Sequence, residues 1–283
     1  MKTKNLGLAV FVSLVAIIGY LYPYQAQADA YKDQKIPQFG HEVVVLLENH
    51  SYEQVIDNSK MPYLNSLAKA YAYTAEYYAN THPSIGNYFF LTTGKIQSND
   101  DGFKGKVTDD NIVRKLNGAG KSWTVYADAL PKVGYMGGNI GTYIKRHNPF
   151  VYFTDVIDHP SQQNKIVPFT QFSKDLAAGT LPSFSFIVPD GCHTSHDCGR
   201  TEADKWLKAN IDPLVKNSSF MKDGLLVIVF DEGQESDKRH GGGRIPVVFV
   251  GDKVRPEYKS REFYQHPDLL RTLLEGLVGI RTS

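Results

Sequence analysis

The chain has 283 residues, which is long enough to bury a large core, and 42% of its residues are hydrophobic, 22% charged and 12% aromatic. These values exclude a collagen, a coiled coil and a largely disordered chain. The formal net charge is only +1, from 31 basic and 30 acidic side chains. So small a charge gives no reason to expect nucleic acid as a dedicated partner.

The first thirty residues have the pattern of an export signal. Lys2 and Lys4 precede an apolar run over residues 6–21, and the small-residue sequence Ala26-Gln27-Ala28 follows it. The run is shorter than the roughly 20 residues that a membrane-spanning helix needs. We therefore interpret residues 1–28 as a cleaved signal peptide and not as an uncleaved anchor. The mature chain, residues 29–283, is then a single domain without a stable membrane anchor, and it is secreted or periplasmic.

Strand and helix patterns alternate along the mature chain. In chain order we predict a strand at 43–47, a helix at 61–70, a strand at 71–78, helices at 84–93 and 109–116, strands at 123–127 and 184–188, a helix at 202–211, strands at 225–230 and 245–250, and a helix from 267 on. The strongest strands are continuous apolar runs, which are typical of strands covered by helices on both faces. The alternation predicts an α/β architecture with a largely parallel sheet.

Polar side chains follow two of these buried strands. Glu48 and Asn49 come directly after the strand at 43–47, and Asp231 and Glu232 come directly after the strand at 225–230. Such residues are also ordinary at strand ends. The carboxyl ends of parallel strands are, however, where ligands bind in open α/β sheets. Two acidic clusters at one edge would repel each other unless a cation lay between them.

Ser84 stands at the predicted entrance of the helix at 84–93. Unpaired N–H groups and the helix dipole favour an anion at such an entrance. Ser84 is either a simple N-cap, which is common for serine there, or a nucleophile. In the second interpretation its hydroxyl is activated by a cation held at the strand ends and attacks phosphorus.

Cys192 and Cys198 are the two cysteines of the chain. In an exported protein they are expected to form a disulfide. Their spacing does not match the paired cysteines of structural zinc sites, which is the alternative. The disulfide would close a short loop that contains His193, His196 and Asp197.

Six segments of the mature chain together resemble the bacterial phosphoesterase family, which contains secreted acid phosphatases and phospholipases C and belongs to the alkaline-phosphatase-like superfamily. The segments are 48–52, 82–88, 146–150, 189–198, 229–233 and 264–267. Residues 84–94 also resemble the nucleophile motif of nucleotide pyrophosphatases. The resemblance implies a three-layer α/β/α sandwich with a largely parallel central sheet, and a phosphoesterase catalytic domain at 29–283.

The resemblance also implies site residues. It makes Ser84 the nucleophile and Asn87 a donor to a phosphoryl oxygen, and it makes His147 and His196 groups that contact phosphate or protonate the leaving oxygen. The implied metal ligands are Glu48, Asn49, Asp231 and Glu232. Such an all-oxygen set suits Mg²⁺, Ca²⁺ or Mn²⁺ better than zinc.

One segment departs from the family pattern. Thr194 and His193 stand where many members of the family carry Asp and Asn. Asp190, His193 and His196 are therefore candidates for a second metal site with imidazole ligands, which would admit zinc, and Asp197 is a further candidate. Whether the protein holds one metal or two stays open at this point.

Two other positions have open interpretations. Arg244 follows three glycines, which we interpret as a loop, and it is a candidate phosphate contact. His266 precedes Pro267, and it either caps the last helix or belongs to the site.

The sequence thus predicts a secreted, metal-dependent phosphatase that hydrolyses small phosphate monoesters through a phosphoserine. An acidic pH optimum is a further hypothesis, because an unperturbed imidazole is mostly charged, and able to donate a proton, below about pH 6.5. One alternative is a phosphodiesterase or phospholipase C with the same core. The other is an exported protein that binds carbohydrate or cell wall.

Overall fold

The computed structural model describes residues 36–279 of the chain. The predicted signal peptide at 1–28 lies outside the described residues. Residues 38–279 belong to one compact unit. Within the described part of the chain, no helix has both the length and the apolar character that a membrane crossing requires.

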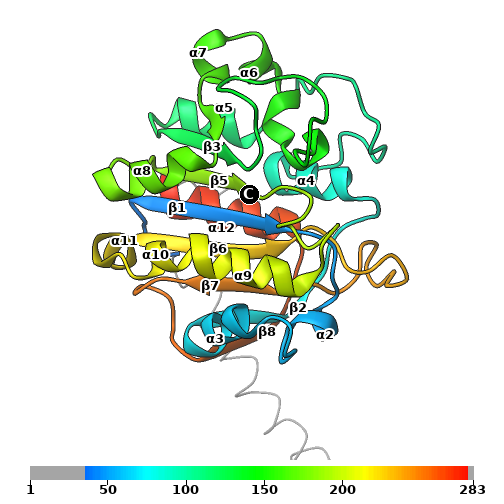
Figure 1. The fold of residues 1–283 in the computed structure, drawn as a ribbon, viewed down its shortest axis with the longest axis vertical. Helices are drawn as coiled ribbons and strands as arrows, with labels where there is room; N and C mark the ends of the chain where they lie inside the picture. Colours follow the sequence, from blue (N-terminus) through cyan, green and yellow to red (C-terminus); the bar gives the residue numbers. More distant parts are fainter. Residues whose placement is uncertain (1–35, 280–283) are drawn as a thin grey trace, which may run out of the picture. The chain divides into compact units, whose positions relative to one another are not determined.

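The unit is built around an eight-stranded sheet with the strand order β4-β3-β5-β1-β6-β7-β2-β8 (Figure 1). The strands are β1 (His41–Leu47), β2 (Ala72–Tyr77), β3 (Trp123–Ala127), β4 (Ile166–Pro168), β5 (Phe184–Val188), β6 (Gly224–Phe230), β7 (Val247–Val250) and β8 (Tyr258–Tyr264). All neighbours pair in parallel except β7, which runs antiparallel to both β6 and β2. The prediction of a largely parallel sheet is confirmed.

Helices cover both faces of this sheet. They are α2 (Tyr52–Val55), α3 (Pro62–Ala70), α4 (Ser84–Thr93), α5 (Ile112–Gly118), α6 (Thr154–Ile157), α7 (Pro160–Gln163), α8 (Thr170–Ala178), α9 (Arg200–Asn210), α10 (Asp212–Val215), α11 (Ser218–Asp223) and α12 (His266–Val278), with 3-10 turns η1 (Lys145–His147) and η2 (Pro149–Tyr152). In Figure 1, α12 passes behind β1 and β6 while α9 lies in front of the sheet. Helix α12 packs against α4, α5 and β1, and α9 packs against α3 and α10. The three-layer α/β/α architecture is thereby confirmed.

The two central strands are buried along almost their whole length. In β1 every residue after His41 is buried, and in β6 every residue is buried. Covering by helices on both faces explains why these strands are continuous apolar runs and not alternating ones. Leu47 of β1 pairs with Phe230 of β6, so both strands end at the same level of the sheet. The residues that follow them, Glu48 and Asp231, are therefore brought side by side.

The observed elements differ from the predicted ones mainly at boundaries and edges. The helix predicted at 109–116 begins at Ile112, because the side chain of Asn111 accepts a hydrogen bond from Arg114 N at 3.2 Å and caps it. The edge strands β4 and β8 were not predicted. Strand β4 has three residues, and β8 is mostly exposed and polar, so neither has the apolar run that identifies a buried strand.

Candidate active site

The carboxyl ends of β1 and β6 bring the predicted metal ligands together. Asp231 N donates a hydrogen bond to Leu47 O at 3.0 Å, which joins the two chain segments just beyond the paired strands. Glu48 and Asp231 are fully buried, and Glu232 is 4% exposed. Three carboxyl groups from two segments that are distant in sequence thus lie in one buried cluster, as the strand-end pattern predicted.

Ser84 faces this cluster from the first residue of α4. Its Oγ lies 3.5 Å from Glu48 Oε2 and 3.4 Å from Glu232 Oε1. The N-cap of α4 is Pro83, and the hydroxyl makes no capping hydrogen bond. The interpretation of Ser84 as a simple N-cap is therefore wrong. The hydroxyl is directed instead at the carboxyl groups of the strand ends.

Two side chains lie against the same oxygen of Glu48. Tyr88 Oη donates to Glu48 Oε1 at 2.6 Å, and His147 Nε2 lies 2.7 Å from the same atom. Burial alone would raise the pKa of Glu48, but nearby His147, the hydrogen bond from Tyr88 and the charge of Arg146 outweigh it and hold that pKa below its usual value. Glu48 is thereby kept ionised, and its second oxygen, Oε2, is the one nearest to Ser84.

Asp231, unlike Glu48, has no side chain within residues 36–279 that donates to its carboxylate. Both of its carboxylate oxygens are buried and have no hydrogen-bond partner among the described residues. Burial, together with the negative charges of Glu48 and Glu232, raises the pKa of Asp231 well above its usual value; Ser84 favours the charged form but does not reach hydrogen-bond geometry. An unpaired buried carboxylate is costly, and a hard divalent cation would remove that cost. The donor set of this cluster therefore fits such an ion.

Glu232 is oriented by a histidine to which the sequence analysis assigned no role. His82 Nδ1 lies 2.8 Å from Glu232 Oε2, and His82 Nε2 lies 2.8 Å from the carbonyl oxygen of Asp237. The close contact with Glu232 raises the pKa of His82 despite partial burial. His82 is two residues from Ser84 in the chain, so its position in the same motif was the available signal.

The two asparagines of the predicted site differ in the number of hydrogen bonds that their side chains make. Asn87 Nδ2 donates to Thr81 O at 2.8 Å and lies 3.5 Å from Glu232 Oε2, while its Oδ1 accepts from Asn80 N and Thr81 N. Asn87 thus braces the segment before α4. Asn49 is partly exposed beside Glu48, and no hydrogen bond engages its side chain within residues 36–279.

The loop closed by the Cys192–Cys198 disulfide divides the remaining candidates into two groups. His193 Nδ1 lies 2.7 Å from Asp128 Oδ2 and 3.0 Å from Asp190 Oδ1. These three residues form a group whose ligand atoms all lie within 4.8 Å of one another. Asp128 directly follows β3. It was not identified from the sequence, because only the acidic residues after the strands at 43–47 and 225–230 stand out as clusters.

His196 belongs to a separate pair in the same loop. Its Nδ1 lies 2.7 Å from Asp197 Oδ1, and both side chains are exposed. Its ring lies 6.4 Å from that of His147, centroid to centroid. The structure therefore places His196 near His147, which contacts Glu48, and it does not place it with Asp190 and His193.

Arg244 and His266 have structural partners. The Arg244 guanidinium donates to the carbonyl of Ala75 and to the carboxylates of Glu53 and Glu76, which occupies all three of its nitrogens. His266 is fully buried; its Nε2 lies 2.7 Å from the carbonyl oxygen of Asp231. Gln265 and not His266 is the N-cap of α12. His266 thus supports the backbone of the cluster.

The sequence profile of the phosphoesterase family matches residues 54–277. Among curated relatives, a phosphatidylinositol-3-phosphatase of Mycobacterium tuberculosis is 33% identical over 87% of this chain and 79% of its own length. A phosphate-repressible acid phosphatase of Penicillium chrysogenum is 30% identical over 89% of this chain and 64% of its own length. An acid phosphatase of Aspergillus fumigatus is 30% identical over 81% of this chain. The chain spans 53–64% of the length of these two fungal relatives.

Solved structures share the fold. A protein of the alkaline phosphatase superfamily from Vibrio parahaemolyticus has a TM-score of 0.59 and 14% identity, and the match covers 85% of this chain and 67% of that chain. The lipoteichoic acid synthase LtaP of Listeria monocytogenes has a TM-score of 0.59 and 14% identity, with 87% of this chain and 74% of that chain covered. At such identities the likeness concerns the fold alone, which is that of the alkaline phosphatase superfamily.

Proposed function

This chain belongs to the phosphoesterase family, and from that premise we propose that it is a secreted, metal-dependent phosphatase that hydrolyses phosphate monoesters through a phosphoserine on Ser84. It is a hydrolase of phosphoric ester bonds, as its relatives named acid phosphatase and phosphatidylinositol-3-phosphatase are. Those names favour monoesters over the diesters of a phospholipase C. Family membership also favours an enzyme over an exported binding protein.

One observation carries the proposal. The Ser84 hydroxyl lies within 3.5 Å of two carboxylates, Glu48 and Glu232, and beside the partnerless carboxyl of Asp231. A serine that served only the fold would have no reason to face three buried acids. Glu48, Asn49, Asp231 and Glu232 are the residues that would hold a divalent cation, with oxygen donors suited to Mg²⁺, Ca²⁺ or Mn²⁺. Such a cation would make the hydroxyl more acidic and offset charge on the phosphoryl oxygens.

The hydrolysis proceeds in two steps, and the residues of the chain have different roles in them. Ser84 Oγ releases its proton to solvent and attacks phosphorus, the new P–O bond forms, and the bond to the leaving alcohol breaks. The N-terminus of α4 favours the negative charge of the phosphoryl group. Water then attacks the phosphoserine, the P–Oγ bond breaks, Ser84 Oγ takes up a proton from solvent, and phosphate leaves. The Asn87 amide donates to Thr81 O at 2.8 Å, and its longer contact of 3.5 Å with Glu232 Oε2 is the one that a phosphoryl oxygen would replace.

We assign the protonation of the leaving oxygen to His196 and a supporting role to His147. His196 is exposed and is oriented by Asp197 at 2.7 Å, so it is open to a substrate. His147 is fully buried, and its Nε2 faces Glu48. In the second step the same His196 accepts a proton from the attacking water.

Export is supported by two features that have independent origins. The first is the leader pattern of residues 1–28. The second is the disulfide between Cys192 and Cys198, because disulfides persist in oxidising compartments.

The experiment compares the protein before and after chelation, and after addition of Mg²⁺, Ca²⁺, Mn²⁺ or Zn²⁺. Hydrolysis of 4-nitrophenyl phosphate should disappear with the metal and return with one of the hard cations. Acid quench during turnover should trap one phosphoryl group on the peptide that contains Ser84. Ser84→Ala should lose turnover by about 10³-fold or more and lose the trapped phosphoryl group.

Ser173→Ala is the matched control, since Ser173 lies on the exposed face of α8 and bonds only to Thr170 O. It should behave as the wild type. Full turnover by Ser84→Ala, or by metal-free wild type, would refute the proposal.

A further inference from the structure

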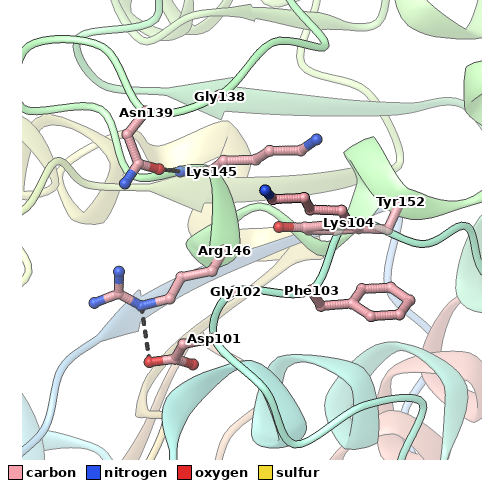
Figure 2. Close-up of a pocket in the computed structure, with 9 residues that line it drawn as sticks. All are labelled: Asp101, Gly102, Phe103, Lys104, Gly138, Asn139, Lys145, Arg146 and Tyr152. Atoms are coloured by element: carbon pink, nitrogen blue, oxygen red, sulfur yellow. Dashed lines mark hydrogen bonds and ion pairs between the residues drawn. The ribbon is translucent and has the colours of Figure 1, made fainter.

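A pocket of about 330 Å³ is lined by residues to which the proposed mechanism gives no role. Its walls come from the segment 101–104, which follows α4, from Gly138 and Asn139, and from Lys145, Arg146 and Tyr152 of η1 and η2 (Figure 2). Three parts of the chain that are distant in sequence thus converge on one hollow.

The pocket has an excess of positive charge. Lys104, Lys145 and Arg146 line it, against one carboxylate, that of Asp101. Asp101 Oδ2 lies 3.2 Å from Arg146 Nε, and no ion pair engages either lysine within residues 36–279. Two ammonium groups in one hollow therefore lack a counter-ion.

Lys145 loses part of its hydration in this position. Its Nζ lies 4.9 Å from the centroid of the Tyr152 ring, and Tyr152 is 2% exposed. Burial lowers the pKa of the Lys145 ammonium, which shows that the charged form loses hydration there. The cation–π contact offsets part of that loss and fixes the direction of the side chain. An anion in the pocket would offset the rest.

The pocket is linked through Asp101 to the residue that follows the nucleophile. Asp101 uses one carboxylate oxygen for Arg146 and the other to accept from Ile85 N at 3.2 Å, the residue after Ser84. Arg146 also precedes His147, which contacts Glu48, and the charge of Arg146 helps to lower the pKa of Glu48. A molecule whose phosphate lies at Ser84 therefore has the cationic pocket beside it.

We propose that the pocket binds a second anionic group of the substrate, so that the preferred substrates are phosphate monoesters that carry another phosphate or phosphodiester on the same molecule. The inference rests on the proposed phosphatase function and specifies its substrate class. Lys104 and Lys145 are the specificity-determining residues, since they are unpaired, while Arg146 remains bound to Asp101. Phe103 and Tyr152 contribute aromatic rings to the lining of the pocket (Figure 2).

The test uses a pair of substrates that differ only in the second anion: propyl phosphate and propane-1,3-diol bisphosphate. For the wild type, kcat/KM for the bisphosphate should exceed that for propyl phosphate by about tenfold or more, because each charge-assisted contact contributes a factor of about ten. The double variant K104Q/K145Q should lose that preference through KM and leave propyl phosphate unchanged. Added salt should reduce the preference of the wild type.

Lys106→Gln is the matched control, because Lys106 is an exposed lysine two residues from Lys104 that is paired with Asp158 at 2.9 Å. It should keep the preference. Equal kcat/KM for both substrates in the wild type, or an unchanged preference in K104Q/K145Q, would overturn the inference while leaving the phosphatase proposal intact.

Two further experiments distinguish a failure of the pocket proposal from a failure of the phosphatase proposal. Binding of the bisphosphate to Ser84→Ala, measured by calorimetry, should weaken about tenfold or more in the S84A/K104Q/K145Q variant. This readout does not depend on turnover, so it tests the pocket even if no monoester is hydrolysed. The second experiment measures hydrolysis of phosphatidic acid in anionic vesicles by the wild type and by K104Q/K145Q. A dependence on the lysines that appears only with vesicles would assign them to a membrane surface and overturn the proposal.

Discussion

The rings of Tyr88 and His147 stack almost parallel, with centroids 5.5 Å apart and planes inclined by 6°. Tyr88 Oη and His147 Nε2 both meet Glu48 Oε1, at 2.6 and 2.7 Å. The stacked pair therefore fixes one oxygen of Glu48 and leaves the other for the side on which Ser84 lies. Tyr88 comes from α4, the helix that also begins with Ser84, so one helix positions the nucleophile and a support of its acidic neighbour.

Tyr88→Phe should weaken metal binding more than it weakens the fold. Burial and the charge of Glu48 raise the pKa of Tyr88, so its hydroxyl stays protonated and donates to Glu48. Without that bond, worth about 1.5–3 kcal/mol when the acceptor is charged, Glu48 binds a proton more readily. We expect Kd for Mg²⁺ to rise about tenfold, with kcat in saturating metal close to that of the wild type.

The measurement is a metal titration of activity at pH 5 and pH 7, and the loss should be larger at pH 5, where protons compete for Glu48. Tyr143→Phe is the matched control, a buried tyrosine whose hydroxyl bonds to Asn148 and not to the acidic cluster. Equal metal affinity in Tyr88→Phe and wild type would show that the bond to Glu48 does not support the ion.

His196→Gln should impair substrates according to their leaving group. An alkyl phosphate needs a proton on its departing oxygen, whereas 4-nitrophenolate leaves as a stable anion. General acid catalysis contributes about 10²–10⁴-fold, so kcat/KM for propyl phosphate should fall by about 10² or more and that for 4-nitrophenyl phosphate by much less.

His193→Gln lies in the same disulfide loop but is engaged by Asp128 and Asp190, and it serves as the control. Its effect should be the same for both substrates. If His196→Gln also lowers both rates equally, His196 is not the group that protonates the alcohol.

The strands and the acidic cluster could be predicted from sequence because both follow from short patterns. A strand covered on both faces is a continuous apolar run, and the polar residue that ends it lies at the binding edge of the sheet. Glu48 and Asp231 were found in this way. The edge strand β8 could not be found, since its residues are mostly exposed and its pairing with β2 depends on partners far away in the chain.

Which side chains contact one another is harder to predict than which residues lie at the edge of the sheet. Tyr88 and His82 lie in the motif of Ser84, but nothing in the order of residues shows that one reaches Glu48 and the other Glu232. Asp128 joins His193 only because β3 and β5 are neighbours in the sheet. Grouping His196 with Asp190 was natural from their closeness in sequence, whereas the loop turns His196 toward His147 and Asp197.

His266 makes the folded protein sensitive to acid. Burial lowers the pKa of His266 to about 4, while an unfolded histidine has a pKa of about 6.5. Between these values the unfolded chain binds a proton that the folded chain does not, so stability falls as pH falls from 6.5 to 4. The contribution is about 3 kcal/mol over that window.

His266→Gln should remove this part of the pH dependence, because glutamine can still donate to the carbonyl oxygen of Asp231 but does not titrate. In urea unfolding the variant should be less stable than wild type at pH 7, and the difference should narrow toward pH 4. A constant difference across the range would mean that His266 is not held neutral.

Glu42 presents a buried acid outside the active site. It lies within β1, is fully buried, and neither carboxylate oxygen has a hydrogen-bond partner among the described residues. Burial raises the pKa of Glu42 well above its usual value, although Lys121 opposes the effect. The folded chain therefore holds a proton that the unfolded chain releases, and stability declines as pH rises from about 4.3, the ordinary glutamate value, toward the raised pKa.

Glu42→Gln keeps the shape and removes the charge, so it should leave stability near pH 4 almost unchanged and raise it at pH 7 by about 1–3 kcal/mol. Thermal unfolding at both pH values measures the difference, and the exposed Glu235→Gln provides the control for a change of net charge. Since no proposed ligand or proton donor is altered, phosphatase activity should persist in the variant. A gain in stability that is equal at pH 4 and pH 7 would contradict the assignment, because only an ionising Glu42 makes the gain grow with pH.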